Sequence, residues 1–125
     1  MYKFYNPNPL SKSVGDCVIR ALSKALNKTW DDIYIDLMLC GYKLKDMPSG
    51  NIVWGSYLKS KGYKRYLIPD ICDDCYTISD FAKNCPLGTF IVCTGTHVVA
   101  IIDGIIYDSW DSGNETPIFY YQKGE

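Results

Sequence analysis

An Asp-Gly pair between two apolar runs most constrains how this chain can fold. Residues 97–102 read His-Val-Val-Ala-Ile-Ile, residues 105–108 read Ile-Ile-Tyr-Asp, and only Asp103 and Gly104 separate them. A two-residue Asp-Gly connection between such runs is a strong signal for a β-hairpin, because both residues tolerate the positive φ angles of the turn. The sequence therefore predicts two antiparallel strands joined by this turn.

The first half of the chain has the apolar spacing of helices instead. The pattern predicts helices from about Asp16 or Cys17 to Leu26, from Thr29 to Gly41, and through Trp54 and Tyr57 to Gly62, with a shorter one over 77–84. Residues 1–13 contain prolines and small polar residues and are expected to form a loop. Further strands are expected over 63–68, 89–94 and 118–121. Helices followed by an antiparallel meander predict an α+β fold, with N-terminal helices packed on a C-terminal antiparallel sheet.

Length and charge limit the classes of function. The 125 residues are enough for one domain with a core, over 1–125. The net charge is -1 and no basic run occurs, which argues against nucleic acid and against an anionic membrane as partners. The N-terminal residues have no apolar segment typical of a signal peptide, so we expect a cytoplasmic protein. In a reducing compartment the six cysteines are expected to be free thiols, metal ligands or a nucleophile.

One cysteine stands where a thiol ionises easily. Cys17 follows Gly15 and Asp16 and opens the first helical pattern. The free N–H groups and the positive dipole at a helix N-terminus favour an anion, and the thiolate is the nucleophilic form of cysteine. Taken alone, a buried structural cysteine at this position is the simpler interpretation. Residues elsewhere in the chain change that balance.

The predicted hairpin places the chain's single histidine near an acid. Counting outward from the turn puts Val99 opposite Asp108, and His97 lies two residues further out, a diagonal neighbour of Asp108 on the same face. A carboxylate at that distance can orient an imidazole, and Trp110 can shield the pair from water and is expected to form a wall of the cleft. Cys17, His97 and Asp108 are then the nucleophile, the base and the orienting acid of an acyl-transfer site. The alternatives are a surface histidine at a strand end and an acid that caps a loop.

Short motifs around these residues resemble the papain-like cysteine peptidase superfamily. Asp108-Ser109-Trp110 is similar to the Asn-Ser-Trp of papain, with Asp in place of Asn. Asp16-Cys17 and His97-Val98-Val99 resemble segments of the bacteriocin-processing (C39-like) peptidases, and the order Cys, His, acid is the same. The resemblance implies a papain-like fold with helices packed on a sheet. It also implies a cysteine peptidase or isopeptidase that needs no cofactor and acts on a peptide or protein.

The chain departs from the family in the oxyanion donor. The family has a glutamine several residues before the nucleophile, whereas the only glutamine here is Gln122. We expect the amide of Asn6 or Asn8 to replace it, beside the Cys17 backbone N–H. Ser11 and Ser13 are poorer substitutes.

Two other functions remain open at this point. Cys72-Asp73-Asp74-Cys75 forms half of a zinc-knuckle pattern, which Cys85 and Cys93 could complete, although a pair of free thiols is the preferred interpretation. That pattern allows a small zinc-knuckle interaction protein. The missing glutamine allows a catalytically silent papain-like module that binds or inhibits a partner. The favoured hypothesis is a thiol-dependent acyl hydrolase.

Overall fold

The chain forms an α+β fold in a computed structural model that describes residues 1–69 and 76–124. The elements, in chain order, are β1 (Tyr2–Phe4), α1 (Cys17–Leu26), α2 (Trp30–Leu44), α3 (Asn51–Ser60), β2 (Tyr63–Leu67), α4 (Ile78–Asn84), β3 (Thr89–Cys93), β4 (Val98–Ile102), β5 (Ile105–Asp108) and β6 (Phe119–Lys123). This order confirms the predicted fold class. Within the described part of the chain, no helix combines the length and apolar character needed to cross a membrane.

The predicted hairpin is present with the predicted register. β4 and β5 pair antiparallel, with Ile102 opposite Ile105 and with Ala100 opposite Tyr107. The connecting turn has positive φ at both residues, 50° at Asp103 and 78° at its glycine. This is the turn geometry for which the Asp-Gly signal is known.

The sheet is mixed, whereas the sequence predicted a purely antiparallel meander. Its six strands are ordered β1-β5-β4-β3-β6-β2. β1 runs parallel to β5, and the expectation of a loop throughout residues 1–13 was wrong for Tyr2–Phe4. A three-residue strand has too little side-chain alternation to stand out beside the prolines that follow it. Its pairing depends on backbone hydrogen bonds to a segment about a hundred residues away.

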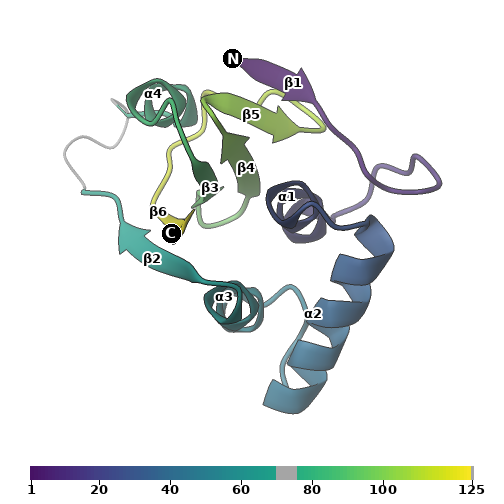
Figure 1. Cartoon of the computed structure of the whole chain (residues 1–125). Helices are drawn as coiled ribbons and strands as arrows, with labels where there is room; N and C mark the ends of the chain where they lie inside the picture. Colours follow the sequence, from purple (N-terminus) through teal and green to yellow (C-terminus); the bar gives the residue numbers. More distant parts are fainter. Residues whose placement is uncertain (70–75, 125) are drawn as a thin grey trace.

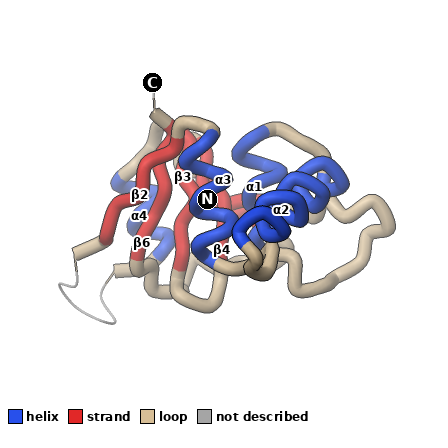
Figure 2. Tube along the Cα trace, turned by 90° about the horizontal axis from the view of Figure 1, so that it is seen from below, coloured by secondary structure: helices blue, strands red, loops and turns tan. Residues whose placement is uncertain are grey.

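Helices cover both faces of the sheet. α1, α2 and α3 lie on one face and α4 lies on the other (Figure 1). Seen from below, the strands gather on one side and α1 and α2 on the other (Figure 2). Alternate residues of β3 and β4 supply the two cores, because successive side chains of a strand point to opposite faces. Ile91 and Ala100 join the core under α1 to α3, while Val92 and Val99 join the core under α4.

Helix ends follow the predicted signals with one exception. α1 ends before Asn27, which adopts the left-handed conformation, and α2 begins after Thr29, whose hydroxyl accepts a hydrogen bond from the backbone N–H of Asp32. α2 was expected to stop at Gly41 but continues to Leu44. A Cβ at Gly41 would lie 2.7 Å from the carbonyl oxygen of Asp46, so this glycine permits close packing inside the helix and does not end it.

Candidate active site

Three elements bring Cys17, His97 and Asp108 together. Cys17 is the first residue of α1, His97 directly precedes β4, and Asp108 is the last residue of β5. Because β4 and β5 are antiparallel, the start of one lies beside the end of the other, and α1 packs against both strands. The distance between His97 Nε2 and Asp108 Oδ2 is 2.6 Å, and the Cys17 thiol forms a hydrogen bond with the same imidazole. The site therefore combines residues from both halves of the chain.

The Asp108 carboxylate is the centre of a buried hydrogen-bond network. Its side chain is only 1% exposed. Besides His97, it accepts hydrogen bonds from Arg20 Nε at 3.1 Å and Nη2 at 2.9 Å, from Ser112 Oγ at 2.7 Å, and from the backbone N–H of Ser109 at 2.8 Å. A buried carboxylate needs such donors in order to stay ionised. Burial opposes ionisation, but the hydrogen bonds from His97 and Ser112 outweigh it and hold the pKa of Asp108 below its usual value.

Arg20 extends this network to the residue before the nucleophile. Its Nη1 binds Asp16 Oδ1, and Trp30 Nε1 donates to Asp16 Oδ2 at 2.8 Å. Both Asp16 and Arg20 are 5% exposed. Sequence reasoning assigned no role to Arg20. The signal that could have found it is the Asp16/Arg20 spacing of four residues, which places an acid and a base on one face of a helix.

A tight turn fixes the backbone of His97. The Thr94 N–H donates to the His97 carbonyl at 2.9 Å, and the His97 N–H donates to Thr94 Oγ1 at 3.1 Å. Gly95 allows this turn with a φ of 99°. Burial disfavours protonation of the imidazole, but the hydrogen bonds to Asp108 and Cys17 outweigh it and raise the pKa of His97 to about 9. His97 is therefore protonated at neutral pH.

The thiol of Cys17 is shifted in the opposite direction. Burial opposes its ionisation, but hydrogen bonds from His97 and from the backbone of Val98, together with the positive charges of His97 and Arg20, lower the pKa of Cys17. A lowered thiol pKa beside a raised imidazole pKa favours a thiolate–imidazolium pair. Such a pair is a ready nucleophile with a proton donor next to it.

The missed strand β1 holds the backbone of the acid. The Tyr5 N–H donates to the Asp108 carbonyl at 2.7 Å, and the Tyr2 hydroxyl donates to the same oxygen at 3.2 Å. β5 is therefore paired on both sides, by β4 and by β1, which limits the movement of its last residue. The N-terminal residues thus help to position the predicted orienting acid.

Trp110 contacts the imidazole, as the sequence suggested. The two ring centroids lie 4.8 Å apart at an interplanar angle of 41°, and Trp110 itself is 46% exposed. The predicted role of Trp110 as a cleft wall was wrong, because Trp110 covers His97 and is not among the residues that line the cleft beside Cys17.

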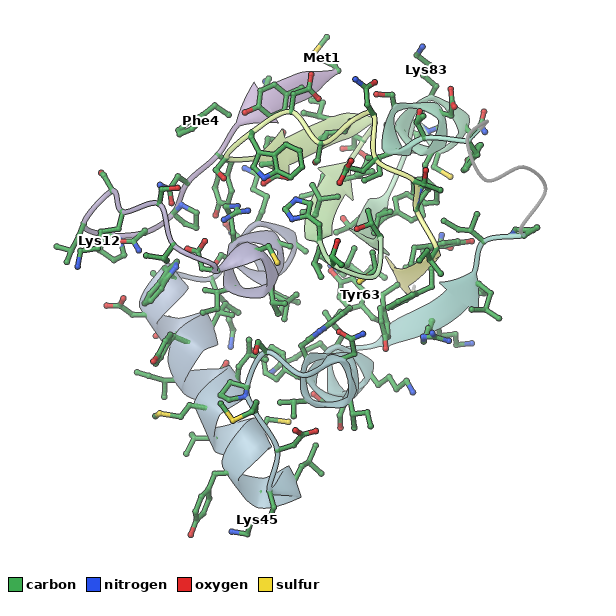
Figure 3. The ribbon with its side chains drawn as sticks, turned by 180° about the vertical axis from the view of Figure 1, so that it is seen from behind. Met1, Phe4, Lys12, Lys45, Tyr63 and Lys83 are labelled. Carbon is green, nitrogen blue, oxygen red and sulfur yellow. The ribbon has the colours of Figure 1, made fainter. Side chains whose placement is uncertain are left out.

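A cleft of about 520 Å³ opens at Cys17 and His97, and neither predicted oxyanion asparagine reaches it. The Asn6 amide donates to the Lys12 carbonyl, and the Asn8 side chain accepts from the N–H of Leu10. Both lie in the loop between β1 and α1, which extends outward to Lys12 (Figure 3). Their placement at the oxyanion position was wrong, because each asparagine stabilises its own proline-rich loop. The side-chain amide that does line the described cleft is Asn51.

The described residues offer no support for the zinc alternative. Cys72 and Cys75 lie outside the described residues. Cys93 faces the core under α1 to α3, whereas Cys85 packs against the core under α4, so the sheet separates the two cysteines predicted to complete the site. Among the described residues, no group of three or more metal-ligating side chains occurs. The zinc knuckle remains a hypothesis about residues 72–75.

A serine pair tests the carboxylate network. We expect Ser112→Ala to lower the free energy of unfolding by about 1.5–3 kcal/mol, because it removes a donor from a buried, ionised acceptor. Ser109→Ala is the matched control, since Ser109 binds Asp108 through its backbone N–H, and it should change stability by less than about 0.5 kcal/mol. Urea unfolding at pH 7 measures both. Equal effects of the two substitutions would contradict the described network.

Comparison of this chain with family models, with curated proteins and with solved structures finds no match in any of the three.

Proposed function

We propose that this protein is a thiol-dependent acyl hydrolase, a cysteine peptidase or isopeptidase with a papain-like arrangement of Cys17, His97 and Asp108. The observation that carries the proposal is the division of one imidazole between two partners. His97 Nε2 binds the buried Asp108 carboxylate, which leaves Nδ1 for the Cys17 thiol. A nucleophile, a base and a group that orients the base are the three parts of such a site.

Acylation begins with attack of the Cys17 thiolate on the carbonyl carbon of the scissile bond. A carbon–sulfur bond forms and the carbonyl π electrons move to oxygen. When the tetrahedral intermediate collapses, the carbon–nitrogen bond breaks and the protonated His97 gives its proton to the leaving amine. The product is a thioester on Cys17 and a neutral imidazole, which Asp108 keeps in the orientation needed for the next step.

Hydrolysis reverses the roles of the same groups. The neutral His97 takes a proton from water as the water oxygen attacks the thioester carbonyl. The carbon–sulfur bond then breaks, the carboxylic acid leaves, and the thiolate–imidazolium pair is restored. The raised pKa of His97 suits the first step, and the buried Asp108 stabilises the imidazolium in both resting and final states.

The first turn of α1 supplies donors for the oxyanion. Backbone N–H groups at a helix start have no intrahelical partner, and Asp16 makes no side-chain cap hydrogen bond to them. The Cys17 N–H is therefore available to a developing negative charge. Asn51 is the second donor that we propose. Its Oδ1 accepts from Trp54 Nε1 at 3.1 Å, which fixes the amide plane and leaves Nδ2 as a donor in the cleft.

The proposal is tested with p-nitrophenyl acetate, a small acyl donor that needs no specificity. We expect a burst of p-nitrophenol equal to the enzyme concentration, acetylation of Cys17 by mass spectrometry, and slow continued turnover. Cys17→Ala should remove the burst, and His97→Ala should remove turnover while any acetyl group on Cys17 persists. An intact protein that gives no Cys17-dependent burst would refute acyl transfer and favour the silent binding module.

A further inference from the structure

The second helix carries an exposed apolar stripe. Its inner face, with Ile33, Leu37 and Gly41, is buried against the rest of the molecule. Its outer face bears five large apolar side chains that are each between 45% and 70% exposed, namely Tyr34, Ile35, Met38, Leu39 and Tyr42, which we call the α2 stripe. The outer face of a surface helix is normally polar, and a contiguous exposed apolar surface marks a binding site.

The α2 stripe runs directly into the cleft at Cys17. Tyr34 and Met38 belong to the stripe and also line the cleft. Met47, which is 68% exposed, lines the same cleft from the loop after α2. α2 projects away from the sheet (Figure 1). Tyr34 and Met38 line the cleft and Tyr42 follows one turn later, so the stripe continues along the helix beyond the cleft. A chain that leaves the cleft in this direction meets apolar side chains over its whole course.

The charges of this surface identify what it can bind. Among the described residues that line the cleft, the charged groups are Asp16, whose carboxylate Arg20 and Trp30 already occupy, and the Cys17–His97 pair, whose opposite charges face each other. Lys45, at the outer end of α2, places a positive charge near the stripe, with its Nζ 3.9 Å from the Tyr42 ring centroid (Figure 3). A charged side chain entering the cleft would lose water without gaining a partner. Apolar side chains have no such cost.

We propose that the α2 stripe binds an extended apolar segment of a protein substrate whose scissile carbonyl lies at Cys17. This inference rests on the proposed acyl transfer. From Tyr34 to Tyr42 the helix rises eight residues, or about 12 Å, which matches about four residues of an extended chain. The substrate class is therefore a protein with about four consecutive, mainly apolar residues beside the cleaved bond. We expect a free amino acid amide or a strongly charged tail to bind less tightly.

Peptide binding tests the inference without any chemistry. The probe is a fluorescein-labelled peptide with the core Leu-Phe-Leu-Leu, compared with matched peptides carrying Lys-Phe-Lys-Leu and Asp-Phe-Asp-Leu, and binding is followed by fluorescence anisotropy. We expect the apolar peptide to bind at least tenfold more tightly than either charged peptide. At saturation it should slow iodoacetamide labelling of Cys17 by at least tenfold, because it covers the cleft.

Two substitutions locate the binding surface. Met38→Glu should weaken binding of the apolar peptide at least tenfold, whereas Ile52→Glu should not, because Ile52 is an exposed apolar residue that lies outside both the stripe and the cleft. Tyr42→Glu should weaken binding of the peptide with the four-residue core Leu-Phe-Leu-Leu. It should leave binding of a shorter peptide with the core Leu-Leu unchanged. Both sites are exposed, so circular dichroism should show an intact fold.

The outcomes separate this inference from the proposed function. If the charged peptides bind as tightly as the apolar peptide, or if Met38→Glu binds the apolar peptide as the native protein does, the inference is overturned. The proposed acyl transfer would then still be decided by the p-nitrophenyl acetate test. Concentration-dependent dimerisation in analytical ultracentrifugation that Met38→Glu abolishes also overturns it, because a second copy would then be the occupant. Selective binding of the apolar peptide without a Cys17-dependent burst would support the α2 stripe as a binding surface and refute the proposed acyl transfer.

Discussion

Replacing His97 with alanine should markedly slow alkylation of Cys17 by iodoacetamide at pH 6. In the native protein the lowered pKa of Cys17 raises the thiolate fraction at this pH, and protonated His97 is its counter-ion. Without the imidazole, the thiol returns toward an ordinary pKa of about 8.5, at which well under about 1% is ionised at pH 6. Site-resolved mass spectrometry of the labelled protein measures the rate.

The pH dependence of Cys17 labelling should differ between the native protein and His97→Ala. The pair exists only above the lowered pKa of Cys17 and below the raised pKa of His97, so the native labelling rate should be flat between these two values. It should fall as the pH drops through the Cys17 pKa. In His97→Ala the fall should begin near pH 8.5.

Two other cysteines serve as internal controls for this labelling. Burial raises the pKa of both Cys85 and Cys93, that of Cys93 to about 12. They should remain almost unlabelled at pH 6 in both proteins. Labelling that is uniform across the described cysteines, or a native profile identical to that of His97→Ala, would contradict the thiolate–imidazolium pair.

Replacing Arg20 with methionine should lower the free energy of unfolding by about 3–5 kcal/mol at pH 7. Arg20 neutralises two buried acids, Asp16 and Asp108, and removing one partner of a buried ion pair leaves an uncompensated charge. Losing this cation also raises the pKa of Asp108. A carboxylate whose pKa is raised on folding destabilises the protein increasingly as the pH rises through its titration. The loss of unfolding free energy caused by Arg20→Met should therefore be smaller at pH 5 than at pH 7.

Matched variants decide whether charge or volume is responsible. Arg65→Met removes the chain's other arginine, which is exposed and lies 4.3 Å from the Phe119 ring centroid, and it should cost no more than about 1 kcal/mol. Adding Asp16→Asn to Arg20→Met should restore part of the stability, because Trp30 can still donate to the asparagine oxygen. Urea unfolding of the four proteins measures these differences. Similar losses for the two arginines would refute the buried network.

Local patterns predicted the parts of the fold that depend on neighbours in sequence. The turn at Asp103 fixes which residues of β4 and β5 face each other, and from that register alone His97 was expected to reach Asp108. The helix that begins at Cys17 and the cap at Thr29 follow in the same way from nearby residues. Each signal spans a dozen residues or fewer, and backbone sterics decide the outcome within that span.

Contacts between distant segments were not predictable in this way. β1 is recognisable only once β5 offers it an edge, and Gly41 resembles a helix terminator until the chain at Asp46 is seen to pack against it. Asn6 and Asn8 carry side-chain amides upstream of the nucleophile, so the sequence predicted that one of them replaces the missing glutamine. The path of the loop, held by its own hydrogen bonds, carries them away from the cleft.

The sequence by itself determined the α+β class and the hairpin, and it singled out Cys17, His97 and Asp108 as the candidate residues of the site. Only the tertiary structure decided that these three meet, that Arg20 connects Asp108 to Asp16, and that the outer face of α2 leads apolar side chains to the cleft. The physical reason is the separation along the sequence over which each kind of interaction acts. Turns and caps are set by backbone geometry over a few residues. Ion networks and exposed faces depend instead on which distant surfaces exclude water together.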